Sequence, residues 1–378
     1  MTGKAQSIKG NTQLEISKFS FPVGLKDYHA DERLNFQLNR PVTLGLGRIE
    51  DIKEAAAKIT DIPSFQKEMS KQAEKAYEEG RYFNAVGYFR VAEFFTPFTD
   101  SEKMGLFDKM IDAFNQAAKD EAVERCTIPY QGGFLETLHL APEESKGVIV
   151  MCGGYDALIE ELYPIASYLA YAGYEVILYE GPGQGSSRYK HGLTFTHEWE
   201  SPTGVVLDYF KVEDVTLIGM SLGGFLAPRA AAFERRISRV VAWDHYYGFT
   251  ECTYELMPSV LRLWIKLLMA LKAKSILSRE PENGHANLVY HGMYLTGTDN
   301  FYDWWLDMSQ YSFPSIAHLV TQDVLVLAGE EDPASPMKFY PRYIKALKNA
   351  KSVMGRVFTK EEHAASHNQI GNIKLALD

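Results

Sequence analysis

A serine between glycines, at the junction of a predicted strand and a predicted helix, constrains this chain more than any other feature. Residues 219–224 read GMSLGG, which places Ser221 in the pattern G-x-S-x-G. The apolar run 215–218 is typical of a buried strand, and the segment after the motif is typical of a helix. Together they predict a nucleophile elbow, a sharp turn that exposes the serine above a sheet. We expect side chains at Gly219 or Gly223 to collide with backbone there.

Predicted strands and helices alternate on both sides of this turn. A hairpin is predicted first, with strands at 127–130 and 134–139 around a Gln-Gly-Gly turn. Alternation of strand and helix implies a mostly parallel, doubly wound α/β sheet with helices on both faces. The further buried strands are predicted at 147–151, 174–179, 240–243 and 324–328.

Two other regions have a helical pattern. Residues 1–124 predict an N-terminal helical domain, although the stretch up to about residue 41 has weak periodicity and is expected to be partly irregular. Its clearest unit is a helical hairpin with a turn at 79–81, similar to a tetratricopeptide-type unit without enough repeats for an array. The second domain is predicted at 125–378, and an aromatic-rich helical lid interrupts it at about 248–320.

Composition excludes several classes of function. The formal net charge is −10, which argues against nucleic acid or an anionic membrane as the main partner. The three cysteines are too few for a disulfide framework, and their odd number fits a reducing compartment. Neither a signal peptide at the start nor an apolar run of about 20 residues is seen. We therefore expect a soluble, cytoplasmic protein.

A serine nucleophile needs a base and an acid, and in this kind of fold they follow the serine in the order acid, then histidine. The predicted strand 324–328 is followed directly by Gly-Glu-Glu-Asp-Pro. Asp332 is the best candidate for the acid because this loop can turn back to the carboxyl edge of the sheet. Glu330 and Glu331 are the alternatives, and both read as solvated loop charges.

Two histidines, His363 and His367, follow Asp332. Their spacing would also suit two metal ligands on one helix face, but the chain offers no H-E-x-x-H motif or cysteine pair to complete a site. We therefore expect no metal and no cofactor. One histidine is predicted to be the base and the other a polar neighbour.

An oxyanion hole requires two backbone N–H donors. One is expected from Leu222, and the other from Gly154 or Tyr155 in the glycine-containing loop after the predicted strand 147–151. Asp156 precedes a predicted helix, so its default role is a helix N-cap. A second glycine-rich stretch, 180–186, fails the dinucleotide and P-loop patterns and is interpreted as a tight turn.

These motifs together resemble the α/β-hydrolase superfamily from about residue 125 to the end. Residues 180–186 (EGPGQGS) are similar to its Pro-Gly-x-Gly-x-Ser turn. More narrowly, the chain resembles a branch with an N-terminal helical domain, which includes 2,6-dihydroxy-pseudo-oxynicotine hydrolase, polyketide-shortening fungal hydrolases and proteins described as prolyl-oligopeptidase-like or acylaminoacyl-peptidase-like. The branch motif Gly-Ala-x-x-His-Cys-Gln resembles 363–369 (HAASHNQ), with histidine for glycine and asparagine for cysteine. This resemblance assigns the base to His367.

The resemblance implies a helical domain that closes the pocket, and homodimers are frequent among such proteins. We predict a serine hydrolase that cleaves an ester or amide of a small or medium acyl compound through an acyl-enzyme, with Ser221, His367 and Asp332 as the triad. One alternative is a carbon–carbon bond hydrolase of diketone-like compounds, with Glu251 or His245 as an extra acid. The others are an acylaminoacyl peptidase acting on short peptides and, least favoured, a non-enzymatic helical scaffold.

Overall fold

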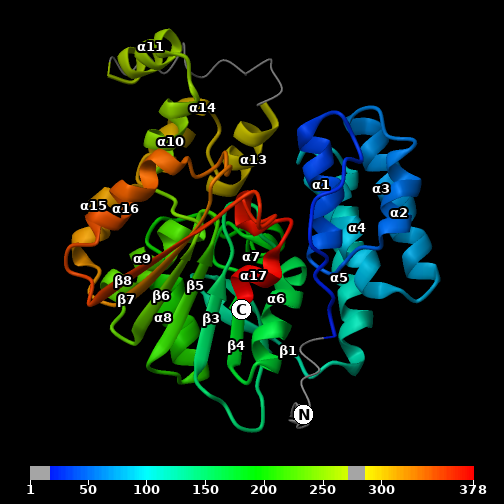
Figure 1. Ribbon diagram of the computed structural model, residues 1–378, viewed down its shortest axis with the longest axis horizontal. Coiled ribbons are helices and arrows are strands. Elements are labelled where there is room, and N and C mark those ends of the chain that lie inside the picture. The colour runs from blue at the N-terminus through cyan, green and yellow to red at the C-terminus, as the bar shows by residue number, and fades with distance from the viewer. Residues whose placement is uncertain (1–17, 271–285) are drawn as a thin grey trace.

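The computed structural model describes residues 18–270 and 286–378, and it confirms the predicted α/β architecture (Figure 1). One eight-stranded sheet has the order β1-β2-β4-β3-β5-β6-β7-β8. The strands are β1 Glu124–Tyr130, β2 Gly133–Leu140, β3 Val148–Cys152, β4 Glu175–Tyr179, β5 Val215–Met220, β6 Ile237–Trp243, β7 Asp323–Gly329 and β8 Ser352–Phe358.

Most of the sheet is parallel, so the loops that follow its strands gather at one edge. The exceptions are the predicted hairpin β1–β2 and the pair β2–β4, which are antiparallel. From β4 to β8 every neighbouring pair is parallel. The segments after β3, β5, β6 and β7 therefore leave the sheet on the same side. The predicted triad and oxyanion residues lie on the segments after β3, β5 and β7 and, for His367, on the segment after β8, which pairs with β7 in parallel.

Side chains of the parallel strands alternate between two cores, one on each face of the sheet. In β3, Ile149 and Met151 pack into the core shared with α6, α17 and the N-terminal helices. Val150 and Cys152 pack into the opposite core, with α8, α9, α16 and part of the insertion. Burial on both faces explains why these strands read as unbroken apolar runs in the sequence.

The helices form three groups. The N-terminal group is α1 Glu32–Thr43, α2 Ile49–Ala56, α3 Ile62–Glu78, α4 Tyr82–Phe94 and α5 Glu102–Ala117. The helices that accompany the sheet are α6 Ile159–Tyr171, α7 Gly185–Tyr189, α8 Glu200–Phe210, α9 Gly223–Phe233, α16 Tyr340–Ala346 and α17 Ile373–Leu377. The insertion holds α10 Phe249–Leu256, α11 Ser259–Ala270, α13 Ala286–Thr296, α14 Phe301–Met308 and α15 Phe313–Ile316.

The predicted helical hairpin is α3 and α4, joined at 79–81. Gly80 adopts a φ of +72°, and the N–H of Arg81 bonds the carbonyl of Ala76 at 2.8 Å, which closes the end of α3. The opening stretch up to about residue 41 is partly irregular, as predicted, because residues 18–31 form no helix or strand and α1 begins at Glu32. Asp31 starts this helix by accepting hydrogen bonds from the N–H groups of Arg33 and Leu34.

The insertion leaves the sheet after β6 and stands above it in Figure 1. Its two ends meet in a short antiparallel bridge between Gly248 and Ser312. Residues 271–285 of the predicted lid, and the start of the chain, lie outside the described residues. Within the described ranges, no helix is both long enough and apolar enough to cross a membrane.

A buried guanidinium joins the N-terminal helices to the sheet. Arg90 on α4 is 2% exposed, and its Nε donates to Glu161 on α6 at 3.0 Å. One terminal nitrogen donates to Glu93 at 2.8 Å. The other reaches the carbonyl oxygen of Asp156 at 2.6 Å and its carboxylate at 3.1 Å. Arg40 on α1 donates to Glu161 at 2.7 Å, so two helices of the N-terminal group hold the same segment.

Replacing Arg90 is expected to destabilise the whole protein. Among the described residues, Arg90→Leu would remove one of the two cations that each buried carboxylate contacts, which leaves Glu93 with Lys103 alone and Glu161 with Arg40 alone. Breaking a buried ion pair from one side costs about 3–5 kcal/mol. The measurement is the free energy of unfolding from urea denaturation. The control is Arg33→Leu, whose exposed pair with Asp31 is worth about 0–1 kcal/mol. Equal stability of the two variants would contradict a structural role for the Arg90 network.

Candidate active site

Ser221 lies at the tip of a strained turn between β5 and α9. Its φ is +61°, a left-handed conformation that costs a non-glycine residue of the order of 1 kcal/mol or more. The turn is fixed by a hydrogen bond from the Ser221 N–H to the carbonyl oxygen of Trp243 at 2.7 Å. The strand, turn and helix predicted around Ser221 are therefore all present.

The glycines around Ser221 are required by close contacts. A Cβ on Gly219 would lie 2.0 Å from the carbonyl oxygen of Gly223, and one on Gly223 would press on that of Gly153 at 3.2 Å. Side chains at both positions would therefore collide with backbone, as expected, and the collision at Gly223 would be the less severe. Gly224 is a third such position, because its Cβ would lie 1.7 Å from the carbonyl oxygen of Asp244.

The structure brings Ser221, His367 and Asp332 into one hydrogen-bonded chain. Nε2 of His367 lies 2.8 Å from Oγ of Ser221, and Nδ1 lies 2.9 Å from Oδ2 of Asp332. An ionised carboxylate only accepts, so Nδ1 carries the hydrogen. Nε2 is then the acceptor for the serine hydroxyl, which is the arrangement that general-base activation of a serine requires.

The other residues considered for these roles lie elsewhere. His363 is exposed and near Gly24, so it does not reach Ser221. Glu330 accepts the N–H of Lys360 at 2.7 Å, and Glu331 pairs with the Lys360 ammonium at 3.2 Å. Both glutamates are exposed loop charges, as predicted.

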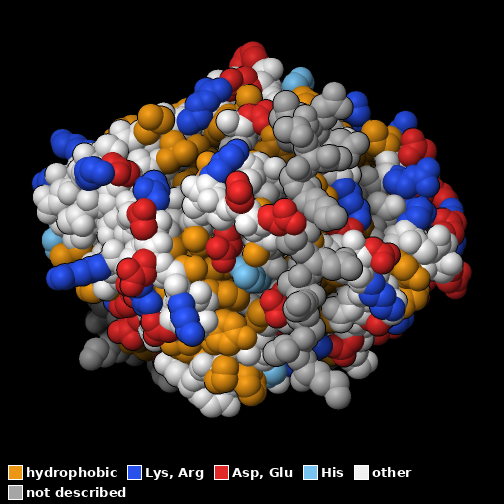
Figure 2. All heavy atoms as spheres, turned by 90° about the horizontal axis from the view of Figure 1, so that it is seen from below, with side chains coloured by type: hydrophobic (Ala, Val, Ile, Leu, Met, Phe, Trp, Pro, Cys, Tyr) orange, Lys and Arg blue, Asp and Glu red, His pale blue; other side chains and the backbone are white. Residues whose placement is uncertain are grey.

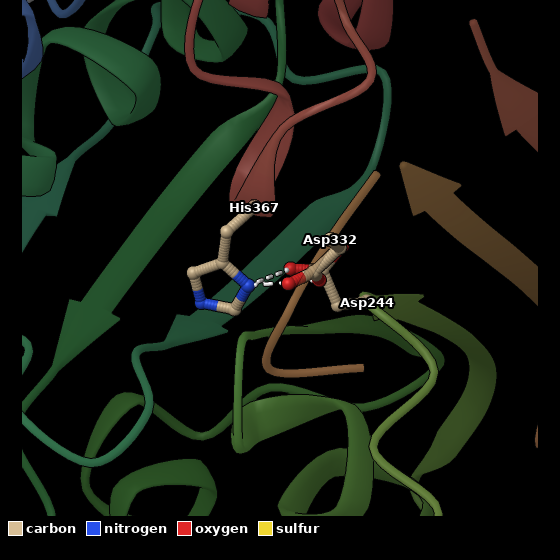
Figure 3. Close-up of side chains that lie close together, drawn as sticks. All are labelled: Asp244, Asp332 and His367. Atoms are coloured by element: carbon tan, nitrogen blue, oxygen red, sulfur yellow. Dashed lines mark hydrogen bonds and ion pairs between the residues drawn. The ribbon is translucent and has the colours of Figure 1, made fainter. Parts of the chain in front are cut away.

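A second carboxylate, Asp244, was missed by the sequence analysis. It follows β6 directly, is fully buried, and places Oδ2 3.0 Å from the same Nδ1 of His367 (Figure 3). The sequence did contain a signal for it, because an aspartate immediately after a buried parallel strand reaches the same sheet edge as Asp332. The expected order of serine, acid and histidine does not separate the two, because both aspartates lie between Ser221 and His367 in the chain.

The two aspartates differ in electrostatics. Burial raises the pKa of Asp332, but His367 and the backbone N–H groups of Ala334 and Ser335 outweigh it and lower this pKa overall. Burial and the nearby charge of Asp332 raise the pKa of Asp244. Burial lowers the pKa of His367, but the two carboxylates reverse this effect and raise it well above its ordinary value. Asp332 is therefore the principal charged partner of the imidazole.

The same three residues are the group best placed to hold a cation among the described residues. Asp244, Asp332 and His367 offer ligand atoms that all lie within 4.8 Å of one another. Their protein hydrogen bonds already account for this cluster, because Nδ1 donates to the carboxylates and Nε2 faces Ser221. No cofactor or metal is needed to explain the geometry.

The predicted oxyanion donors lie beside the serine. A Cβ on Gly154 would be 2.8 Å from both the Leu222 nitrogen and the Ser221 Cβ, so this loop contacts the elbow. The Gln184 side-chain amide donates to the carbonyl oxygens of Gly153 and Gly154 at 3.0 and 2.7 Å. In trans peptides the N–H points opposite to the C=O, so the Gly154 and Tyr155 amides both face away from Gln184. Both remain candidates beside Leu222.

The N-cap predicted at Asp156 is wrong. The N-cap of α6 is Leu158, without a side-chain bond. The Asp156 carboxylate instead pairs with Arg90 at 3.1 Å and Arg40 at 3.5 Å. Two buried or half-buried guanidinium groups compete better for a carboxylate than backbone amides do. The segment after the candidate oxyanion loop is thus held by the N-terminal helices.

A cavity of about 720 Å³ opens onto Ser221 and His367. Its wall comes from three parts of the chain, namely the N-terminal helices, the loops at the sheet edge, and α13 of the insertion. Apolar side chains such as Phe36, Phe94 and Phe98 line much of it, together with charged side chains that include Arg40 and Asp156. This volume is in the range of sites for small organic ligands.

Adding a methyl group to Gly154 is expected to damage the site without unfolding the protein. Gly154→Ala would push against the Leu222 amide and displace an oxyanion donor, for which losses of about 10²–10³ in kcat are typical. The measurement is kcat on an activated ester. The control is Gly105→Ala in α5, where a Cβ meets nothing within 4 Å. Full activity of Gly154→Ala would contradict the assignment of this loop.

Residues 149–368, more than half of the chain, match the family model described as "Alpha/beta hydrolase family". Among curated proteins, an alpha/beta hydrolase ucsC of Acremonium sp. is 30% identical over 224 residues, covering 50% of this chain and 45% of the relative. A hydrolase acrC of Aspergillus aculeatus is 31% identical over 215 residues, covering 47% and 49%. These matches span about half the length of the curated relatives.

Solved structures share the fold over most of the chain. AbyA5 superposes with a TM-score of 0.66 at 18% identity and covers 87% of this chain and 88% of its own. The 2,6-dihydroxy-pseudo-oxynicotine hydrolase superposes with a TM-score of 0.62 at 16% identity and covers 90% and 94%. At these identities the similarity establishes the fold alone.

Proposed function

The chain belongs to the alpha/beta hydrolase family, and on this premise we propose that it is a serine hydrolase that cleaves an ester or amide of a small or medium apolar acyl compound. The observation that carries the proposal is the chain of contacts from Ser221 through His367 to Asp332, at 2.8 and 2.9 Å. A scaffold protein would have no need of these three side chains in this order and geometry.

In the proposed reaction, Ser221 attacks the substrate carbonyl while His367 takes its proton at Nε2. Asp332 holds Nδ1–H and stabilises the imidazolium that forms. The oxyanion binds the N–H of Leu222 and that of Gly154 or Tyr155, and each such donor contributes about 3–4 kcal/mol to lowering the barrier. The protonated His367 then returns its proton to the leaving group, which leaves an acyl-enzyme for hydrolysis by water.

The cavity supports a small organic substrate. Its apolar wall and volume of about 720 Å³ suit an acyl group that is aliphatic or aromatic rather than charged. The N-terminal helices and α13 form part of this wall, which favours a small molecule over a folded protein chain as the substrate. On the face shown in Figure 2, basic and acidic side chains are interspersed rather than gathered into a basic patch of the kind that binds nucleic acid.

The test is steady-state hydrolysis of nitrophenyl esters of increasing acyl length, together with aminoacyl anilides. Ser221→Ala is expected to lose about 10⁴-fold or more in kcat because the attacking oxygen is removed. The matched control is Ser366→Ala, another serine on the cavity wall, because the ring nitrogens of His367 pair with Ser221, Asp332 and Asp244 rather than with this hydroxyl. Retained turnover in Ser221→Ala would refute the proposal.

A second candidate, carbon–carbon bond hydrolysis, is favoured by His291 on α13. Among the described residues, His291 lines the cavity and neither Glu251 nor His245 does. Burial lowers the pKa of His291 to about 4, so the ring is neutral at neutral pH and can donate one hydrogen bond. Its Nε2 has no hydrogen-bond partner within the described part of the chain. A neutral donor there would stabilise the oxygen of a departing enolate.

This candidate predicts a selective effect of His291→Ala. Cleavage of a β-diketone is expected to fall by about 10²-fold or more, the usual contribution of a positioned acid–base group. Hydrolysis of an ester of similar size should change little, because its alkoxide receives the proton of His367. His363→Ala serves as an exposed control. An equal fall with both substrates, or no diketone cleavage by the wild type, would exclude this candidate.

A further inference from the structure

We propose that Asp244 is a second positioning acid, which shares the Nδ1 hydrogen of His367 with Asp332, so that the imidazole is held by two carboxylates rather than one. This inference rests on the proposed function. Its basis is that Oδ2 of Asp332 and Oδ2 of Asp244 lie 2.9 and 3.0 Å from one nitrogen (Figure 3). One N–H can point between two acceptors, and each then takes part of the hydrogen bond.

The fold delivers the two carboxylates from adjacent strands. Asp244 directly follows β6, and Asp332 lies in the loop after β7, which pairs with β6 in parallel. At Asp244 the backbone has a φ of +82°, which is uncommon for a non-glycine residue. Gly224 leaves room for this conformation, since any Cβ there would collide with the Asp244 carbonyl. The chain thus accepts a strained backbone that turns this carboxylate toward His367.

Asp244 accepts hydrogen bonds from the segment that carries His367, whereas Asp332 accepts a hydrogen bond from its own loop. Oδ2 of Asp244 accepts the N–H of Asn368 at 3.0 Å, and Oδ1 accepts from the Gln369 side chain at 3.5 Å. Oδ1 of Asp332 accepts the N–H of Ala334 at 2.8 Å. Asp244 therefore fixes both the ring of His367 and the backbone that carries it.

The two acids do not bear equal charge in the resting protein. Coulomb repulsion between buried carboxylates that meet at one nitrogen disfavours ionisation of both. Asp332 accepts backbone N–H groups from Ala334 and Ser335, whereas Asp244 accepts that of Asn368 alone among the described residues, so Asp332 holds the charge more readily. When His367 becomes an imidazolium during the reaction, both carboxylates face its positive Nδ1. A further charged group near the ring is Asp156, whose pKa the charge of His367 helps to lower, and the exposed Glu331 also lines the cavity.

The first test compares Asp332→Asn, Asp244→Asn and the double variant. Removing the acid of a single-acid triad costs about 10⁴-fold in kcat. With Asp244 still in place, Asp332→Asn is expected to lose only about 10²-fold, and the double variant the full 10⁴-fold or more. A loss of about 10⁴-fold in Asp332→Asn alone would overturn the proposal. If Asp244→Asn does not fold, the size of the loss in kcat of Asp332→Asn alone decides whether Asp244 shares the role.

The second readout is the pH profile of kcat/KM, which a purely structural role would not move. His367 must be neutral to act as a base, so activity is lost as the pH falls through its pKa. Because Asp244 helps to raise that pKa, Asp244→Asn should shift the acidic limb to lower pH. An unshifted limb in a folded variant would overturn the proposal. Ser221→Ala distinguishes a failure of the Asp244 proposal from a failure of the proposed function. Activity that survives in Ser221→Ala would refute the proposed serine hydrolase itself.

Discussion

The strained turn at Ser221 is the constraint around which the rest of the site is built. A left-handed serine between a buried strand and a helix is stable here only if residues two before and three after it have no side chains and the surrounding backbone is held. Gly219 and Gly224 provide the space, and the carbonyl of Trp243 provides the hydrogen bond. The end of β6 therefore supports the elbow and supplies Asp244 in the next residue. A change at this strand end would alter both the nucleophile and the histidine.

The N-terminal helices contribute more than a cover for the cavity. Arg90 and Arg40 bind the segment just after the candidate oxyanion loop, and Gln184 binds that loop from the other side. The Gly154 backbone is thus held between side chains that come from distant parts of the sequence. Buried ion pairs contribute little net stability, but their geometry is directional, so they define where the loop lies. This places the helical group and the sheet in one functional unit.

Much of the fold and the centre of the site could be predicted from sequence, since both depend on local patterns. Apolar runs identified the central strands, and the glycines identified the elbow with Ser221. Three other features depend on partners distant in sequence. The edge strand β8 has several exposed residues and no apolar run. Asp156 prefers arginines on remote helices to the nearby helix end. Asp244 follows an identified strand, but only the folded sheet shows that it and Asp332 reach the same nitrogen.

The most direct test of the central claim is labelling with a fluorophosphonate, followed by intact-mass measurement and peptide mapping. An activated serine is phosphonylated because its hydroxyl has a base beside it, whereas ordinary serines do not react. The account predicts one adduct per chain, located on Ser221, and none on Ser221→Ala. An adduct on another residue, or a folded wild-type protein that is not labelled although it hydrolyses esters, would contradict the claim that Ser221 is the nucleophile.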